Sequence, residues 1–168
     1  MVSTIQEFFA DAKKAGKTFD AFVANYNLTS KVTADHICYK CSAQTIFETI
    51  RKMFESESDW IYQAIISKRR IATIRTKQCL ETLAGNINLV ELSDQKPDGS
   101  QTDGFDHIEM YPTSIPYDAL VSYLRKQGLD VKEVVRPHHT THDITLENGF
   151  IIRLTRDPLV NKIKKEQQ

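Results

Sequence analysis

Apolar residues recur at helical spacing over the first part of the chain, from Thr4 to Tyr26. A face repeating every three to four positions predicts amphipathic helix, and Gly16 in its middle predicts a break between two helices. We interpret this segment as a helical extension packed on the rest of the protein. The residues that define its apolar face are Ile5, Phe8, Phe9, Ala12, Phe19, Phe22, Val23 and Tyr26.

The rest of the chain shows the order strand, helix and three strands, and it shows this order twice. β-rich runs with alternating apolar positions predict the strands, and apolar residues three and four apart predict the helices. The first copy has strands at 33–41, 60–66, 71–76 and 87–92 and a helix at 43–54. The second has strands at 105–111, 131–135, 143–147 and 150–154 and a helix at 117–126.

Two short motifs mark the same positions in both copies. Asp35-His36-Ile37 recurs as Asp106-His107-Ile108, an offset of 71 residues (107 − 36). The last strand of each copy carries one charged residue between apolar neighbours, Glu91 in the first and Arg153 in the second. A repeat with a histidine at its start and a charge at its end predicts two modules that share a central site.

These patterns divide the chain into five parts and predict an α+β fold. A helical extension (1–30) precedes the first β-α-β-β-β module (31–95), and a polar linker with proline and glycine (96–104) leads to the second (105–158). The fifth part is a polar tail (159–168), which we expect to be frayed from Asn161 to Gln168. We expect the two modules to bury their uncovered sheet faces against each other and to form a cleft.

Composition excludes several classes of function. The chain has 168 residues, 40% of them hydrophobic, and its 22 basic and 22 acidic side chains cancel. A neutral protein has no field that draws it to nucleic acid or to an anionic membrane surface. The sequence contains no apolar run long enough for a membrane span and no signal-peptide pattern at its start. Three cysteines do not suggest a disulfide framework, so we expect a cytoplasmic protein.

Strand alternation predicts that the repeated histidines face the shared site. His36 lies on one face of its strand with Cys38 and Lys40, while His107 shares a face with Glu109 and Tyr111. A carboxylate such as Glu91 within an apolar run needs a partner or a metal. Two imidazoles and one carboxylate are a common ligand set for a divalent transition metal, so His36, Glu91 and His107 are the candidate ligands. The alternative is that each histidine is a hydrogen-bonded structural side chain.

These motifs resemble those of the vicinal oxygen chelate superfamily, which includes glyoxalases, extradiol dioxygenases and fosfomycin- and bleomycin-resistance proteins. Within it, residues 33–37, 90–92 and 104–109 are most similar to YecM-like proteins. The resemblance implies two β-α-β-β-β modules paired as a curved, incomplete β-barrel around a divalent metal. It also implies that the ligands come from the first and last strands of the modules, which supports His36, Glu91 and His107.

Arg153 departs from this pattern, because a guanidinium cannot donate a lone pair to a metal. One reading is a three-ligand site in which Arg153 binds a substrate carboxylate or phosphate. In another, Glu109 supplies a fourth ligand or acts as general base. The remaining alternative is an ion pair of Arg153 with Glu91 or Glu109 that replaces the metal.

Two other motifs are weaker indications of a functional site. Cys38 and Cys41 form a Cys-x-x-Cys, but strand residues three apart face opposite sides, so we interpret them as ordinary thiols. The histidines of 138–142 follow Pro137 and predict a surface loop, although His142 is a candidate acid or base if it reaches the site.

The predicted function is a divalent-metal-binding cleft protein, with zinc, nickel, manganese or iron(II) as the cofactor. The resemblance implies an isomerase, lyase or dioxygenase that acts on a small oxygen-chelating substrate, with Glu109, His142 and Arg153 as catalytic candidates. One alternative is a non-catalytic module that binds or sequesters a small molecule. Another is an interaction protein whose N-terminal helices dock a partner. We expect the protein to bind a small-molecule ligand and to bind neither nucleic acid nor a membrane. We expect it to be a monomer or a homodimer.

Overall fold

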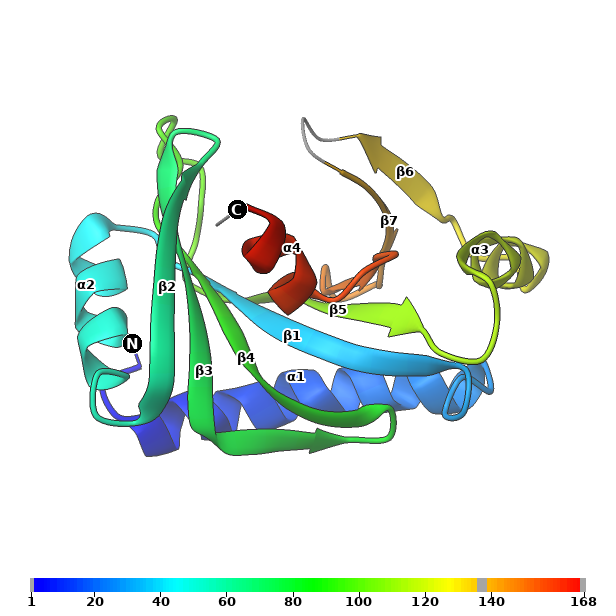
Figure 1. Cartoon of the computed structure of the whole chain (residues 1–168), viewed down its shortest axis with the longest axis horizontal. Coiled ribbons are helices and arrows are strands. Elements are labelled where there is room, and N and C mark those ends of the chain that lie inside the picture. The colour runs from blue at the N-terminus through cyan, green and yellow to red at the C-terminus, as the bar shows by residue number, and fades with distance from the viewer. Residues whose placement is uncertain (1, 136–138, 167–168) are drawn as a thin grey trace.

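The structure is a computed structural model that describes residues 2–135 and 139–166. These residues form four helices and eight strands, and the order strand, helix and three strands occurs twice, as predicted (Figure 1). The first part contains α1 (Ile5–Asn25), β1 (Val32–Lys40), α2 (Gln44–Met53), β2 (Ser58–Ile66), β3 (Arg69–Thr82) and β4 (Gly85–Ser93). The second contains β5 (Gly104–Pro112), α3 (Tyr117–Lys126), β6 (Lys132–Val135), β7 (Thr140–Thr145), β8 (Ile151–Leu154) and α4 (Leu159–Glu166).

All eight strands form one curved sheet in the order β2-β3-β4-β1-β5-β8-β7-β6. Each module contributes one half, and the halves meet where β1 and β5 pair antiparallel. Within each module the first strand pairs in parallel with the last, β1 with β4 and β5 with β8. The predicted α+β fold of two β-α-β-β-β modules in a curved, open sheet is therefore confirmed.

The expected packing of one module's sheet face against the other was wrong. The modules join edge to edge, because pairing β1 with β5 satisfies the backbone groups that both edges would otherwise leave open. Figure 1 shows α1, α2 and α3 on one face of the sheet and α4 on the other. We call these the convex and the concave face.

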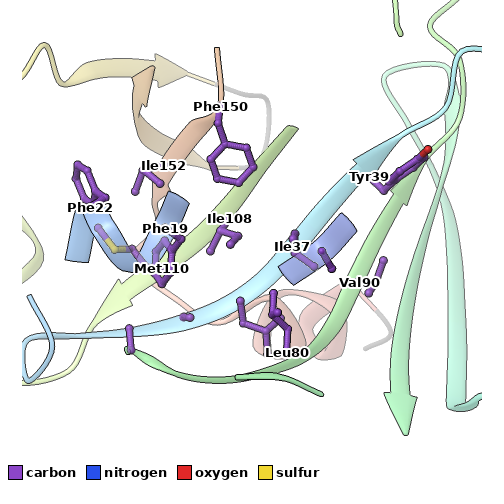
Figure 2. Packing of buried hydrophobic residues seen from close by; sticks show 14 of the residues in the cluster. Phe19, Phe22, Ile37, Tyr39, Leu80, Val90, Ile108, Met110, Phe150 and Ile152 are labelled. Atoms are coloured by element: carbon purple, nitrogen blue, oxygen red, sulfur yellow. The ribbon is translucent and has the colours of Figure 1, made fainter. Parts of the chain in front are cut away.

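The main core fills the space between the sheet and the three convex-face helices. Phe8 and Phe19 of α1, Phe47 of α2 and Leu120 of α3 are completely buried. Figure 2 shows Phe19 and other core side chains close to the strands at the centre of the sheet. The N-terminal segment is thus packed on the rest as expected, and it supplies a large part of the apolar core.

The predicted break at Gly16 was wrong, since α1 is one helix of 21 residues. Gly16 is buried, and a Cβ atom placed on it would lie 3.2 Å from a methyl carbon of Leu80. The glycine therefore lets the helix approach β3 closely. This requirement comes from tertiary packing, and it outweighs the modest helix propensity of glycine.

The C-terminal segment forms α4 on the concave face, where we had expected a frayed polar tail. The backbone N–H of Leu159 donates to Asp35 at 2.9 Å, and Lys162 donates to Thr155 at 2.7 Å. Ile163 is buried, so the helix also packs through an apolar side chain. Among the residues described, no helix is long and apolar enough to cross a membrane.

Candidate metal centre

The seam between the modules brings the predicted ligands onto one face. Cys38 of β1 is the Cα partner of Glu91 on one side and of His107 on the other. Cross-strand partners share a face, and so do alternate residues of a strand. His36, Glu91 and His107 therefore all lie on the concave face, and Glu109 joins them as the partner of His36.

Each repeated histidine is held by the aspartate before it. Nδ1 of His36 lies 2.8 Å from Oδ2 of Asp35, and Nδ1 of His107 lies 2.7 Å from Oδ2 of Asp106. An ionised carboxylate accepts, so Nδ1 carries a proton, and in the neutral imidazole Nε2 is then left with a lone pair. Metal-binding histidines commonly have such a partner. The repeated Asp-His pair contained this signal, but alternation along the strand argued against a contact between neighbours.

Nε2 of His36 is buried and has no hydrogen-bond partner. It lies 4.0 Å from Oε2 of Glu91 and 3.9 Å from Oε1 of Glu109. One ligand atom each from His36, Glu91 and His107 lie within 4.8 Å of one another, and so do atoms of Asp35, His36 and Glu109. The structure thus places a basic nitrogen and two carboxylates around one small volume.

The two histidines have opposite pKa shifts. Burial alone would lower the pKa of His36, but the carboxylates of Glu109, Asp35 and Glu91 outweigh it and raise the pKa above its ordinary value. For His107, burial and the nearby Arg153 guanidinium lower the pKa despite the contact with Asp106. His107 therefore favours the neutral form that binds metal.

Glu109 is a buried, ionised carboxylate. Burial would raise its pKa, but His36 and Lys162 outweigh this effect and bring the pKa down to about 2. Nζ of Lys162 in α4 lies 3.4 Å from Oε2 of Glu109. A carboxyl group with so low a pKa is a weak general base, so the geometry favours Glu109 as a ligand or as a partner of a cation.

We predict that protonation of Glu109 lowers the free energy of unfolding as the pH falls. Its pKa is lower in the folded chain than the ordinary 4.5, so its contribution is present above that pH and is lost as pH falls toward about 2. The free energy of unfolding of wild type and Glu109→Gln should differ by up to about 3 kcal/mol at neutral pH. This difference should shrink in acid when measured by urea unfolding. Glu55→Gln, at an exposed site, should follow the wild-type profile, and a difference that does not change with pH would contradict the prediction.

Arg153 pairs with Asp143, a residue that the sequence analysis did not single out. Nε and Nη2 of Arg153 donate to the two carboxylate oxygens of Asp143, each at 2.8 Å. Nη1 lies 3.0 Å from Nε2 of His107 and donates to it. The alternative of an ion pair with Glu91 or Glu109 is therefore not the arrangement found, because the register of β7 and β8 places Asp143 directly beside Arg153.

The structure does not bring His142 to the site. It is the Cα partner of Leu154, while its neighbour Asp143 is the partner of Arg153, so His142 points to the convex face. There its Nδ1 lies 2.8 Å from the hydroxyl of Tyr117, which donates to the carbonyl of Leu154 at 3.1 Å. His138 of the same histidine-rich motif lies outside the described residues.

Cys38 and Cys41 are both buried free thiols. Cys38 lies on the concave face beside its cross-strand partner Glu91; burial raises the pKa of its thiol, and the Glu91 carboxylate raises it further. Cys38 is therefore held in the thiol form.

The donor set fits a divalent metal ion in composition and size. Nε2 of His36 is a buried acceptor without a partner, and an ion at that point would satisfy it. Ligand atoms bound at about 2.0–2.2 Å lie closer together than 4.8 Å, so binding requires a small contraction of the group. It also requires Nη1 of Arg153 to leave Nε2 of His107.

One solved structure shares this architecture, and two others are similar over a smaller share of the chain. A solved structure described as Protein EC4020, from structural genomics, has 18% identity and a TM-score of 0.65 over 92% of this chain and 90% of its own. Methylmalonyl-CoA epimerase in complex with methylmalonyl-CoA and NH4+ has 18% identity and a TM-score of 0.49 over 78% and 98%. Hypothetical protein BH1468 from Bacillus halodurans C-125 has 12% identity and a TM-score of 0.49 over 75% and 94%.

No match was found among the curated proteins. The family model described as YecM protein matches residues 4–146, which cover the first module and most of the second and include all three candidate ligands. The relationship expected from the two Asp-His motifs is confirmed: the chain belongs to the YecM protein family.

Proposed function

We propose that this protein binds one divalent transition-metal ion at the seam of its two modules, through His36, Glu91 and His107. The observation that carries the proposal is the buried, unpartnered Nε2 of His36, which faces two carboxylates. A cation at this position would offset the repulsion between the carboxylates and satisfy the nitrogen. Asp35 and Asp106 would hold the two imidazoles in the required tautomer.

The general kind of activity that this site supports is metal-dependent chemistry on a small molecule with neighbouring oxygen atoms. When bound, a divalent ion would supply Lewis acidity to the oxygens of such a substrate. Three protein ligands leave coordination positions open for it. Zinc, nickel, manganese and iron(II) all accept this donor set. An isomerase or lyase reaction and a dioxygenase reaction are both compatible with it.

The surrounding side chains would position the ligands and balance charge. Lys162 keeps Glu109 ionised and away from bulk water, since α4 lies over that part of the concave face (Figure 1). Arg153 is held by Asp143, so in this arrangement its planar fork is not available for a substrate anion. We therefore assign Arg153 an electrostatic role beside His107.

Elemental analysis tests the proposal directly. Protein purified without a metal chelator or a histidine tag should contain about one equivalent of a transition metal, and His107→Ala should lose it. His142→Asn is the matched control, because it removes a histidine from the opposite face and should keep the metal. Absence of metal in the wild type, even after addition of zinc, nickel, manganese or iron(II), would refute the proposal.

The contact between Arg153 and His107 favours a second candidate function. Nη1 of Arg153 already occupies the nitrogen that a metal would need. If this contact persists in solution, the protein is a metal-free module that binds a small molecule without chemistry. Metal titration of the wild type and of Arg153→Met separates the two functions. A metal-binding wild type should take up the ion, and the variant should bind it at least as tightly, whereas a metal-free module should take up metal only after Arg153 has been removed.

A further inference from the structure

Arg75 differs from every other cation in the strands of the sheet. Six of the seven lysine and arginine side chains in the described strands have a hydrogen-bond or ion-pair partner. These contacts are Lys40 with Asp106, Arg69 with Gln101, Arg70 with Asp94, Lys77 with Ser56, Lys132 with Asp130, and Arg153 with Asp143. Arg75 has none in the part of the chain described, and its Nε is buried and unsatisfied.

The guanidinium of Arg75 lies against Trp60. The two residues are cross-strand partners on β3 and β2, and the guanidinium carbon lies 5.3 Å from the centroid of the Trp60 ring. This cation–π contact holds the guanidinium over the ring but gives its hydrogen-bond donors no acceptor. An arginine held in place with unused donors is preorganised for an oxyanion.

Arg75 lies on the same concave face as the candidate metal centre. Thr73 is the Cα partner of Glu91, and Arg75 is two residues further along β3 on the same face. This spacing is roughly 7 Å along the strand. Tyr62, the partner of Thr73 on β2, adds a second aromatic ring to this wall. The wall combines one unpaired cation with two partly exposed aromatic rings beside Glu91.

We propose that Arg75, held by Trp60, is an oxyanion-binding subsite that takes the carboxylate or phosphate group of a small organic acid. The apolar body of this ligand would lie on the rings of Trp60 and Tyr62. That the ligand is the substrate of the metal centre rests on the proposed function; the subsite itself needs no metal. It takes the role that the sequence suggested for Arg153, whose donors are used by Asp143 and His107.

Trp60 provides the measurement, because it is the single tryptophan of the chain. Its fluorescence would be followed while metal-free protein is titrated with cyclohexanecarboxylate, cyclohexyl phosphate and the neutral cyclohexanecarboxamide. At least one of the anions should bind about 10-fold or more tightly than the amide. The tighter of the two identifies the oxyanion as carboxylate or phosphate.

Three variants complete the experiment. Arg75→Gln should remove the preference for the anion and leave amide binding unchanged. Arg75→Lys keeps the charge without the planar fork and should retain an intermediate preference, which also shows that the wall stays folded. Lys13→Gln removes one charge from an exposed position on α1 and should behave as wild type.

Equal binding of amide and anions by the wild type would overturn the inference, and so would an unchanged anion preference in Arg75→Gln. Because the titration uses metal-free protein, its result does not depend on the metal centre. Anion binding in a protein that takes up no metal would refute the proposed function and leave the subsite standing. Metal uptake without anion binding would refute the subsite and leave the proposed function standing.

Discussion

Replacing Asp143 with asparagine should destabilise the protein by about 3–5 kcal/mol, the usual cost of removing one partner from a buried ion pair. The side chains of Arg153 and Asp143 are only 13% and 12% exposed, and both carboxylate oxygens accept from the guanidinium. The asparagine would leave a buried positive charge beside His107 without compensation. Urea unfolding of wild type and Asp143→Asn at neutral pH measures the difference.

An exposed ion pair of the same chemistry is the control. Arg156 and Asp118 also lie 2.8 Å apart, but their side chains are 58% and 79% exposed. Asp118→Asn should therefore cost only about 0–1 kcal/mol. The double change Asp143→Leu with Arg153→Met should cost less than Asp143→Asn alone, because it removes both charges. Equal effects of Asp143→Asn and Asp118→Asn would show that the buried pair is not formed.

Replacing Glu91 with glutamine should lower the affinity for the metal by more than about 100-fold, beyond the roughly 10–100-fold loss typical of a residue that only supports a ligand. Glutamine keeps the size of the side chain but removes the charge that faces Nε2 of His36. Isothermal titration of metal-free protein with zinc, nickel and manganese measures the loss.

Two further variants define the ligand set. Asp106→Asn should lower the metal affinity by roughly 10–100-fold, because Asp106 orients His107 but does not bind the ion itself. Glu109→Gln should lower the metal affinity less than Glu91→Gln does if Glu109 stays paired with Lys162. It should lower the affinity as much if Glu109 is a fourth ligand. Glu55→Gln, at an exposed site on the convex side, should bind as wild type. Unchanged metal affinity in Glu91→Gln would remove this residue from the centre.

The fold was predictable to the extent that it follows from local periodicity. Apolar spacing identified the strands and helices of both modules, and the repeated Asp-His motif identified their equivalence. The motif also indicated that His36 and His107 share a face, because alternation along a strand is set by backbone geometry. Gly16 was misread as a helix break, because its role depends on Leu80, a residue 64 positions away (80 − 16).

The surroundings of the site could not be predicted in the same way. Arg153 was recognised as a departure, but its partner Asp143 is set by the pairing of β7 with β8. His142 and Asp143 are neighbours in the chain, and the same register sends only the second to the concave face. Lys162 reaches Glu109 because α4 packs where the sequence suggested a tail.

The sequence by itself determined the two modules, their relation by repeat, and the histidines and carboxylate that meet at their seam. These features depend on periods of two and 3.6 residues, which are local properties of the chain. Only the tertiary structure decided which charges are neutralised and which remain free. Arg153 is paired and Arg75 is not, because strand register and helix packing, which join residues distant in sequence, decide whether each guanidinium meets a carboxylate.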